Sequence, residues 1–381
     1  MSAIDPLAPD EWPAPPKRFS ATALEQIRVC PHRYQLLRGK YGSAWGMPMP
    51  PGTSAIAGRI VHEALSEVLI ALGKAGNPEL GSPDFQGVLA SLNLKARLAE
   101  LREAELTNAR KGNHPRAPHY QFPVGLSELR SHVFLLLRAT YRKGHSPWQV
   151  LPQVAPSSAL WIERLQRKGL LSEVELSHAS LPLMGIIDLV KRGETGTELI
   201  DFKTGRDAPD AHQRQLELYA LLWADETQDV PVRLTRIHPE GEQSSAFGPD
   251  QLVKVRERII QELADAESIL RQFPAPANVG EHCSQCIARL RCASFWNLPA
   301  AQRRGERDVW DLQLTPLERP SATWLTARLL ASDEVVSIVF DPIHHATFST
   351  YGEASTLRIL NAQRDSEGTV LVGPRAEVWP I

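Results

Sequence analysis

Two patterns of hydrophobic positions divide the chain, one typical of helices and the other of strands. In residues 54–73 the apolar side chains Ile56, Ile60, Ala64 and Val68 recur at helical spacing and share one face. Thr22 and Glu25 have the spacing of a capping box, and Pro31 can open a helix. The same reasoning predicts helices over residues 22–29, 31–38, 54–73, 85–110, 125–143, 211–226 and 250–272.

Between these helices, apolar and polar residues alternate as they do in strands. The alternation predicts strands over 170–178, 181–192 and 197–205, and a fourth over 230–239. The sequence GETG at 193–196 fits a turn, so the first three strands should form an antiparallel meander. We therefore expect an α/β fold with a mixed central sheet flanked by helices.

The last part of the chain is rich in strands and has no clear helix. Five short strands are expected over 324–331, 334–341, 346–352, 355–363 and 369–379. This spacing is typical of a small all-β barrel or sandwich, and an OB-like barrel, a fold that binds single strands, is one candidate.

Proline-rich stretches suggest where the domains begin and end. Residues 1–18 predict a flexible leader, and 297–320 predict a linker. The main domain would then span 19–296 with a helical insertion at about 72–150, and the β-domain would span 321–381.

Composition narrows the class of protein. Hydrophobic residues make up 43% and charged residues 23% of 381 residues, which excludes a wholly disordered chain. No apolar run reaches the roughly 18 residues of a membrane span, and the acidic, proline-rich start does not resemble a secretory signal. We expect a cytoplasmic protein without a membrane partner. The net charge of −2 excludes a wholly basic surface but allows a local basic channel.

Two carboxylates and a lysine form the first candidate site. Asp201 and Lys203 are two residues apart on one predicted strand, so they share a face, and Asp188 lies on the neighbouring strand. Adjacent carboxylates repel each other unless a cation lies between them, and Mg²⁺ prefers hard oxygen ligands. The Phe202 carbonyl could add a ligand, and His62 could complete the shell. Lys203 would then orient a water or stabilise charge on a phosphate.

Simpler interpretations exist for each of these residues. Asp201 and Lys203 could form a surface ion pair, and a lone histidine beside an apolar helix face is more often structural. The apolar neighbours Leu199, Ile200 and Phe202 indicate a buried strand, where charges need a partner, so we favour a metal site.

The cysteines form a second candidate site. Cys283, Cys286 and Cys292 lie within ten residues, and Cys30 is alone near the start. Four thiolates are a full ligand set for a zinc ion or an iron–sulfur cluster, and spacing alone does not separate the two. Free buried thiols are a third interpretation.

Basic and aromatic residues suggest contacts with nucleic acid. Arg206 follows the predicted strand that carries Asp201 and could bind a phosphate near the metal. Arg116 and Tyr120 lie in a basic loop, where the tyrosine ring could stack on a base. A solvated surface is the simpler interpretation of that loop.

The ordered motifs resemble a known family. GRIVH at 58–62, GIID at 185–188, DFKTG at 201–205 and QLELY at 215–219 resemble the PD-(D/E)XK nuclease superfamily, in its RecB/AddB-type branch. The cysteine spacing is similar to the iron–sulfur staple of that branch, which CRISPR adaptation nucleases share. A hydrophobic residue, Ile187, stands where the classical motif has proline, as is usual in this branch.

The resemblance implies a restriction-endonuclease-like core and a role for each residue. His62, Asp188, Asp201 and the Phe202 carbonyl would bind Mg²⁺ or Mn²⁺. Lys203 would be the catalytic lysine, and Gln215 and Tyr219 would position it, the water or the DNA. The four cysteines, Cys30, Cys283, Cys286 and Cys292, would bind a [4Fe–4S] cluster rather than zinc.

The function implied is a metal-dependent DNA nuclease, an exonuclease on single-stranded or unwound ends, in repair, recombination or phage defence. The chain has no P-loop motif, so a helicase partner would have to supply a motor. Alternatives are a non-catalytic module that binds DNA ends, a subunit of a helicase–nuclease complex, and an RNA-processing nuclease.

Overall fold

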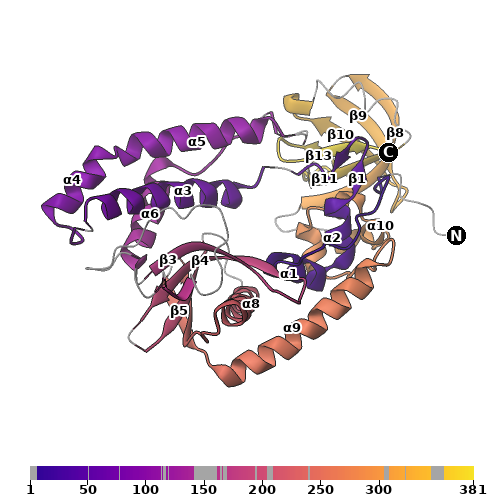
Figure 1. The fold of residues 1–381 in the computed structure, drawn as a ribbon. Helices are drawn as coiled ribbons and strands as arrows, with labels where there is room; N and C mark the ends of the chain where they lie inside the picture. Colours follow the sequence, from indigo (N-terminus) through magenta and orange to yellow (C-terminus); the bar gives the residue numbers. More distant parts are fainter. Residues whose placement is uncertain are drawn as a thin grey trace. The chain divides into compact units, whose positions relative to one another are not determined.

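The computed structural model describes residues 7–381 except 50, 77, 113, 115–116, 119, 141–160, 164, 166–169, 194, 204–208, 239–240, 304–308, 322 and 345–355. The chain folds into two compact units (Figure 1). The sheet unit comprises Pro16–Glu25 and Pro50–Glu267, and the barrel unit comprises Met1–Pro15, Gln26–Met49 and Ser268–Ile381. These units divide the chain differently from the expected boundary at residue 296.

The sheet unit contains a five-stranded sheet in the order β3-β4-β5-β6-β7. Its strands are β3 (Leu170–Ser177), β4 (Met184–Arg192), β5 (Thr197–Phe202), β6 (Arg233–His238) and β7 (Gly241–Ala246). β3, β4 and β5 form the predicted antiparallel meander, whereas β5 and β6 are parallel. Helix α8 (Pro209–Thr227) connects this parallel pair, as a parallel crossover requires.

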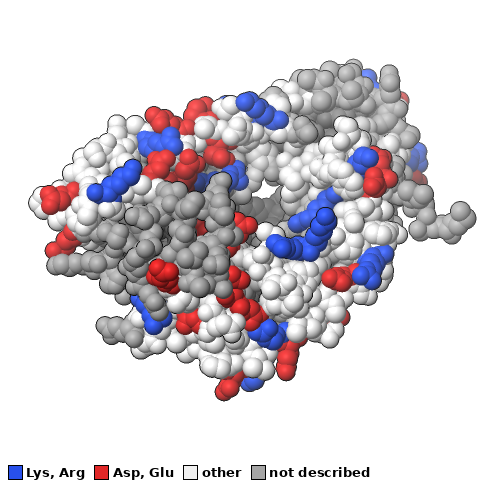
Figure 2. Space-filling view, viewed as in Figure 1, with Lys and Arg blue, Asp and Glu red and all other residues white. Residues whose placement is uncertain are grey.

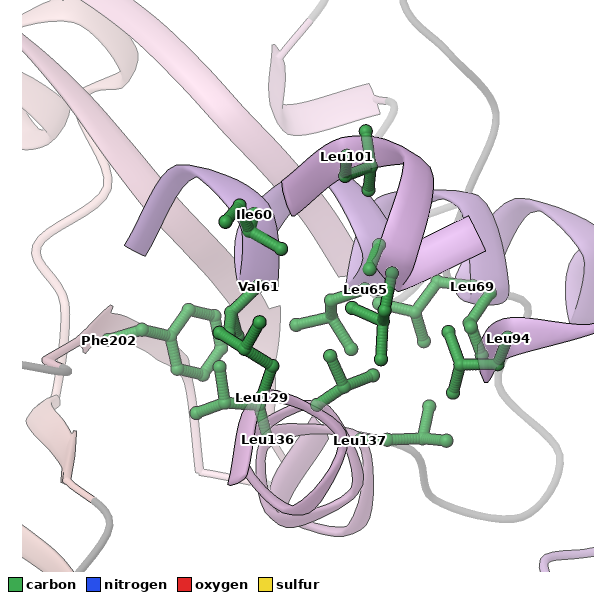
Figure 3. Close-up of a cluster of buried hydrophobic side chains, with 14 of the residues drawn as sticks. Ile60, Val61, Leu65, Leu69, Leu94, Leu101, Leu129, Leu136, Leu137 and Phe202 are labelled. Carbon is green, nitrogen blue, oxygen red and sulfur yellow. The ribbon is translucent and has the colours of Figure 1, made fainter. Parts of the chain in front are cut away.

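A layer of helices covers the face of β5 that carries Ile200 and Phe202. It contains α3 (Thr53–Lys74), α4 (Pro83–Ser91), α5 (Leu94–Arg110) and α6 (Leu126–Thr140). Their leucine-rich faces meet in one buried cluster, and Phe202 of β5 points into it beside Val61 (Figure 3). This packing holds the end of β5 against α3.

Three details of this unit differ from the sequence prediction. The expected helix over 85–110 is two helices, because Asn93 adopts a left-handed backbone with φ of 44°. α1 (Ala21–Val29) begins before Thr22, and the Ser20 hydroxyl accepts the Ala23 N–H at 3.2 Å. β7 was not predicted, because its residues are almost all exposed and lack alternation.

The barrel unit contains the C-terminal strands. These are β8 (Val309–Ser321), β9 (Trp324–Leu329), β10 (Val335–Phe340), β11 (Leu357–Arg364), β12 (Val370–Val372) and β13 (Glu377–Pro380). β12 pairs with both β10 and β11, which closes a small all-β barrel around a buried core. The expected strand over 346–352 lies outside the described residues.

Two expectations about flexible segments are wrong where the structure describes them. The second half of the predicted linker is strand β8, which pairs with β9 and β11. In the predicted leader, Pro9 and Pro13 are buried, and Glu11 forms a β-bridge with Lys40.

The cysteines belong to short elements of the barrel unit. α2 (Pro31–Arg38) follows Cys30, and the hairpin of β1 (Lys40–Tyr41) and β2 (Ala44–Trp45) follows α2. The remaining elements include α9 (Pro249–Leu270), which leads from the sheet unit into this one. The short helices are η1 (Glu281–Gln285), η2 (Arg289–Arg291), α10 (Ala293–Trp296), η3 (Ala300–Arg303) and η5 (Pro342–His344). Within the described residues, none of the helices is both long and apolar enough to cross a membrane.

Candidate active site

The two predicted carboxylates lie opposite each other at the end of the β4–β5 ladder. Leu189 pairs with Ile200, and the next position of this antiparallel register sets Asp188 against Asp201. The Phe202 N–H donates to Asp188 Oδ2 at 2.7 Å. The side chain of Asp188 therefore holds β5 where the ladder between the two strands ends.

A chain of contacts links Asp201 to helix α8. Lys203 Nζ lies 2.7 Å from Asp201 Oδ2 and donates a hydrogen bond to Gln215 Oε1 at 2.9 Å. Gln215 Nε2 in turn donates to the Tyr219 hydroxyl at 2.7 Å. Gln215 and Tyr219 are one helical turn apart, so both reach the same side of the sheet. The structure thus brings together four of the predicted residues.

Burial and mutual repulsion change the acidity of this pair. Burial and the charge of Asp188 together raise the pKa of Asp201 to about 7, although the nearby Lys203 opposes both effects. Burial also raises the pKa of Asp188 to about 6. Two carboxylates this close disfavour each other's ionised form, whereas a cation bound between them would favour the ionised form of both.

Oδ2 of Asp201 is buried and faces a positive charge. The side chain is 1% exposed, and its Oδ2 lies 2.7 Å from Lys203 Nζ. A buried carboxylate needs a positive partner, and a hard metal ion could share this role with Lys203.

His62 approaches from α3, on the other side of β5. Its ring contacts Phe202 edge-on, with the ring centroids 6.3 Å apart. Burial lowers the pKa of His62, and Asp201 only partly opposes this, so the neutral imidazole with a free lone pair is favoured. Neutral imidazole is the form that binds metals.

Gly185 is a residue of the site for which no role was predicted. A Cβ at this position would lie 2.7 Å from Cε1 of Tyr219, so the tyrosine ring packs directly on the glycine backbone. A glycine inside a predicted strand is the sequence signal for such a close approach.

Glu173 lies opposite Asp188 on β3, between the pairs Ser172–Leu189 and Val174–Ile187. Its backbone is left-handed, with φ of 48°, which is uncommon for a residue with a side chain. Its charge raises the pKa of Asp188. Of the two glutamates on the predicted strand, Glu173 is therefore the one coupled to the carboxylate pair.

The four cysteines line one cavity of the barrel unit. Cys30 caps α2, and its Sγ accepts the Arg33 N–H at 3.4 Å. Cys283, Cys286 and Cys292 lie in and between η1, η2 and α10. Burial, together with the nearby charges of Cys286, Cys30 and Cys283, raises the pKa of Cys292 to about 12. Such crowded, buried thiols require a partner to ionise together.

The three predicted nucleic-acid contacts are not all described. Arg116 and Arg206 lie outside the described residues. The Tyr120 hydroxyl lies 3.0 Å from Thr53 Oγ1, at the start of α3.

No three His, Cys, Asp or Glu side chains of the described residues are grouped closely enough to hold a single metal ion. His62, Asp188 and Asp201 are therefore neighbours rather than a finished three-ligand set.

The comparison with protein families agrees with the motifs. Residues 18–293 match the family model described as the PD-(D/E)XK nuclease superfamily. The solved structure titled "Crystal structure of SSO0001" is similar, with 14% identity and a TM-score of 0.24 over 63% of this chain and 96% of that chain. The comparison with curated proteins gave no match.

Proposed function

This chain belongs to the PD-(D/E)XK nuclease superfamily, and from that premise we propose that it hydrolyses phosphodiester bonds of DNA, as an exonuclease on single-stranded or unwound ends. The observation that carries the proposal is the buried pair Asp188 and Asp201 beside Lys203, which Gln215 and Tyr219 hold in place.

Members of this superfamily generally use Mg²⁺ or a similar divalent ion. The residues suited to hold it are Asp188, Asp201, the Phe202 carbonyl and His62. They fit, because they offer hard oxygens on two buried carboxylates that repel each other, and a neutral imidazole. When bound, the metal supplies positive charge for the scissile phosphate and its attacking water.

Lys203 would supply the remaining positive charge. Its side chain is 19% exposed, so the ammonium group can reach a phosphate while the stem stays packed. The hydrogen bond to Gln215 restricts the lysine to one direction, and Tyr219 fixes the amide of Gln215. A positioned charge of this kind stabilises a developing anion without reorganising during the reaction.

The cysteine set fits a [4Fe–4S] cluster. All four thiols face one cavity, and each cysteine of such a cluster binds a different iron, so its ligands need not converge on one point. A structural zinc ion needs four ligands around a single centre. We therefore assign the cluster to Cys30, Cys283, Cys286 and Cys292, with a structural role.

The test uses 5′-labelled single-stranded and duplex DNA with Mg²⁺ or Mn²⁺, and protein purified without oxygen. Asp201→Asn keeps the size of the side chain, and Lys203→Ala removes the ammonium group. We expect each to slow cleavage by about 10²-fold or more, because Asp201→Asn removes a carboxylate that would hold the metal and Lys203→Ala removes positive charge at the phosphate. A series of labelled products that shorten progressively from one end would establish the exonuclease mode.

Lys191→Ala is the matched control, because Lys191 is also a partly buried lysine of this sheet that pairs with an acid, Glu198. It should cleave within about threefold of the wild type, since exposed and partly exposed pairs contribute little. Mg²⁺ should raise the melting temperature of the wild type but not of Asp201→Asn. Undiminished cleavage by Asp201→Asn would overturn the mechanism, and cleavage of RNA alone would overturn the substrate.

A further inference from the structure

A wide groove of about 1040 Å³ lies in the sheet unit, outside the carboxylate site. It is formed by α6, the start of α5, the end of β6 and the start of β7. The side chains that matter here are Lys95, Arg130, Phe134, Arg138, Ile237 and Glu242.

The charge of this groove is mainly positive. Lys95, Arg130 and Arg138 are exposed, and Glu242 is the acid of the lining. Within the described residues, none of the three cations forms an ion pair with an acidic side chain. Their charge is therefore available to a ligand. The wider surface is different, because acidic and basic side chains are interspersed over α4 and α5 (Figure 2).

Helix α6 separates this groove from the core. Arg130, Phe134 and Arg138 recur every four residues and so lie along one side of the helix. Leu129, Val133, Leu136 and Leu137 are buried on its other side (Figure 3 labels three of them). The two arginines contribute nothing to that core, so packing does not explain them. The Arg130 guanidinium lies 5.3 Å from the Phe134 ring centroid.

The groove reaches β6, the strand that pairs with the one carrying Asp201. Ile237 lines it and pairs with Phe202 in the parallel β5–β6 register. The Lys203 N–H donates to the Ile237 carbonyl at 2.9 Å. Because parallel strands end at the same edge of a sheet, a ligand in the groove would lie next to the proposed site.

We propose that this groove binds a single strand of DNA as it enters or leaves the catalytic site. Lys95, Arg130 and Arg138 bind successive phosphates, and one unpaired base stacks on Phe134. A cationic groove with an aromatic face is the arrangement that holds single strands, since a paired base does not offer its face. This inference deepens the proposed function and rests on it for the position of the cleaved bond.

Binding can be measured without cleavage, by fluorescence anisotropy of a labelled 20-nucleotide DNA strand in EDTA. Arg130→Ala with Arg138→Ala should weaken binding at least tenfold. The slope of log affinity against log salt should fall by about 1.4, since each phosphate contact to a single strand contributes about 0.7. The matched control is Lys74→Ala with Lys254→Ala, two exposed lysines of α3 and α9 in the same unit, which should bind like the wild type.

Phe134→Leu tests the stacking. Phe134 also packs against the core, so leucine is used to keep the apolar contact while removing the aromatic face. We expect weaker binding by about fivefold or more, with the salt slope unchanged, because stacking on a ring releases no counterions. Circular dichroism confirms that each variant is folded.

The outcomes separate this inference from the nuclease itself. Wild-type affinity and slope in the arginine variant would overturn the groove, while loss of cleavage in Asp201→Asn would still support the nuclease. If the wild type never cleaves DNA but the double arginine variant still binds DNA more weakly than the wild type, the result would support the groove and contradict the nuclease. Equal affinity for a blunt duplex, or for RNA of the same length, would overturn the assignment to single-stranded DNA.

Discussion

Gly185 decides where the Tyr219 ring can lie, because a Cβ there would be 2.7 Å from the ring. Gly185→Ala should push the ring and α8 away from β4 and so release Gln215 from Lys203. We expect cleavage to fall by about tenfold or more, and stability to fall by about 1–3 kcal/mol from overpacking. Gly87→Ala is the control, because a Cβ there meets nothing and alanine favours a helix. Wild-type cleavage by Gly185→Ala would show that the position of the ring is unimportant.

Tyr219→Phe tests the hydrogen-bond chain without disturbing packing. The variant removes only the hydroxyl that accepts from Gln215 Nε2. Stability should change by less than about 1.5 kcal/mol, the usual range for one hydrogen bond. Turnover should fall by about fivefold to tenfold with little change in DNA affinity, because the lysine is less well directed. A loss of affinity instead of turnover would contradict a positioning role.

At this scale the sequence predicts chemistry better than geometry. The spacing of Asp201 and Lys203, and a strand beside them with Asp188, were sufficient to propose the site. The packing of Tyr219 on Gly185 was not predictable, because it depends on how α8 crosses β4. The coupling of Glu173, rather than Glu175, to Asp188 required the register of β3.

At the scale of elements, a buried ion pair joins the cysteine segment to the barrel. Arg289 lines the cysteine cavity, and its Nε lies 2.6 Å from Asp311 Oδ2 on β8. It also donates to Asn361 on β11 and to the Cys286 carbonyl. One side chain thus connects the loop that carries the cysteines with two strands of the barrel.

Asp311→Ala should destabilise the protein by about 3–5 kcal/mol, because it leaves the Arg289 charge buried without its partner. Urea denaturation measures the loss. Glu334→Ala is the control: Glu334 pairs with Arg364 at the surface, so the change should be below about 1 kcal/mol. Arg289→Met combined with Asp311→Leu should recover part of the stability, since the buried charge of Arg289 is then removed together with that of its partner. Equal effects of Asp311→Ala and Glu334→Ala would show that the buried pair does not join these elements.

Elements with a clear hydrophobic period were predicted, and elements without one were missed. The meander of β3, β4 and β5 follows from alternation and the GETG turn. β7 has the sequence GEQSSA, whose side chains face solvent, so only its pairing with β6 defines it. β8 was taken for a linker because proline and charged residues fill its second half, although its first half packs in the barrel.

At the scale of the whole molecule, the two compact units are not continuous stretches of the chain. The barrel unit is assembled from three separate segments, and most of the sheet unit lies between the second and the third. The sequence could not predict this, because composition marks boundaries along the chain and not contacts between distant segments. One buried cluster contains Leu36, Met47 and Trp296 together with Leu360. Their positions in the sequence do not predict that they share a core.

The four cysteines would link two of these distant segments, because a cluster would join Cys30 to residues about 250 positions away. In chain-entropy terms, closing a loop of that length stabilises a fold by about 5 kcal/mol. Cys30→Ser should therefore lose the brown colour and the bound iron, and lower the melting temperature of anaerobically purified protein. Ser284→Ala is the control, since this exposed hydroxyl lies between Cys283 and Cys286 and, among the described residues, bonds to the Glu281 carbonyl alone; the variant should keep iron and stability. Zinc in place of iron in the wild type would contradict the cluster while leaving the staple in place, whereas wild-type stability of metal-free Cys30→Ser would show that these four thiols do not hold the segments together.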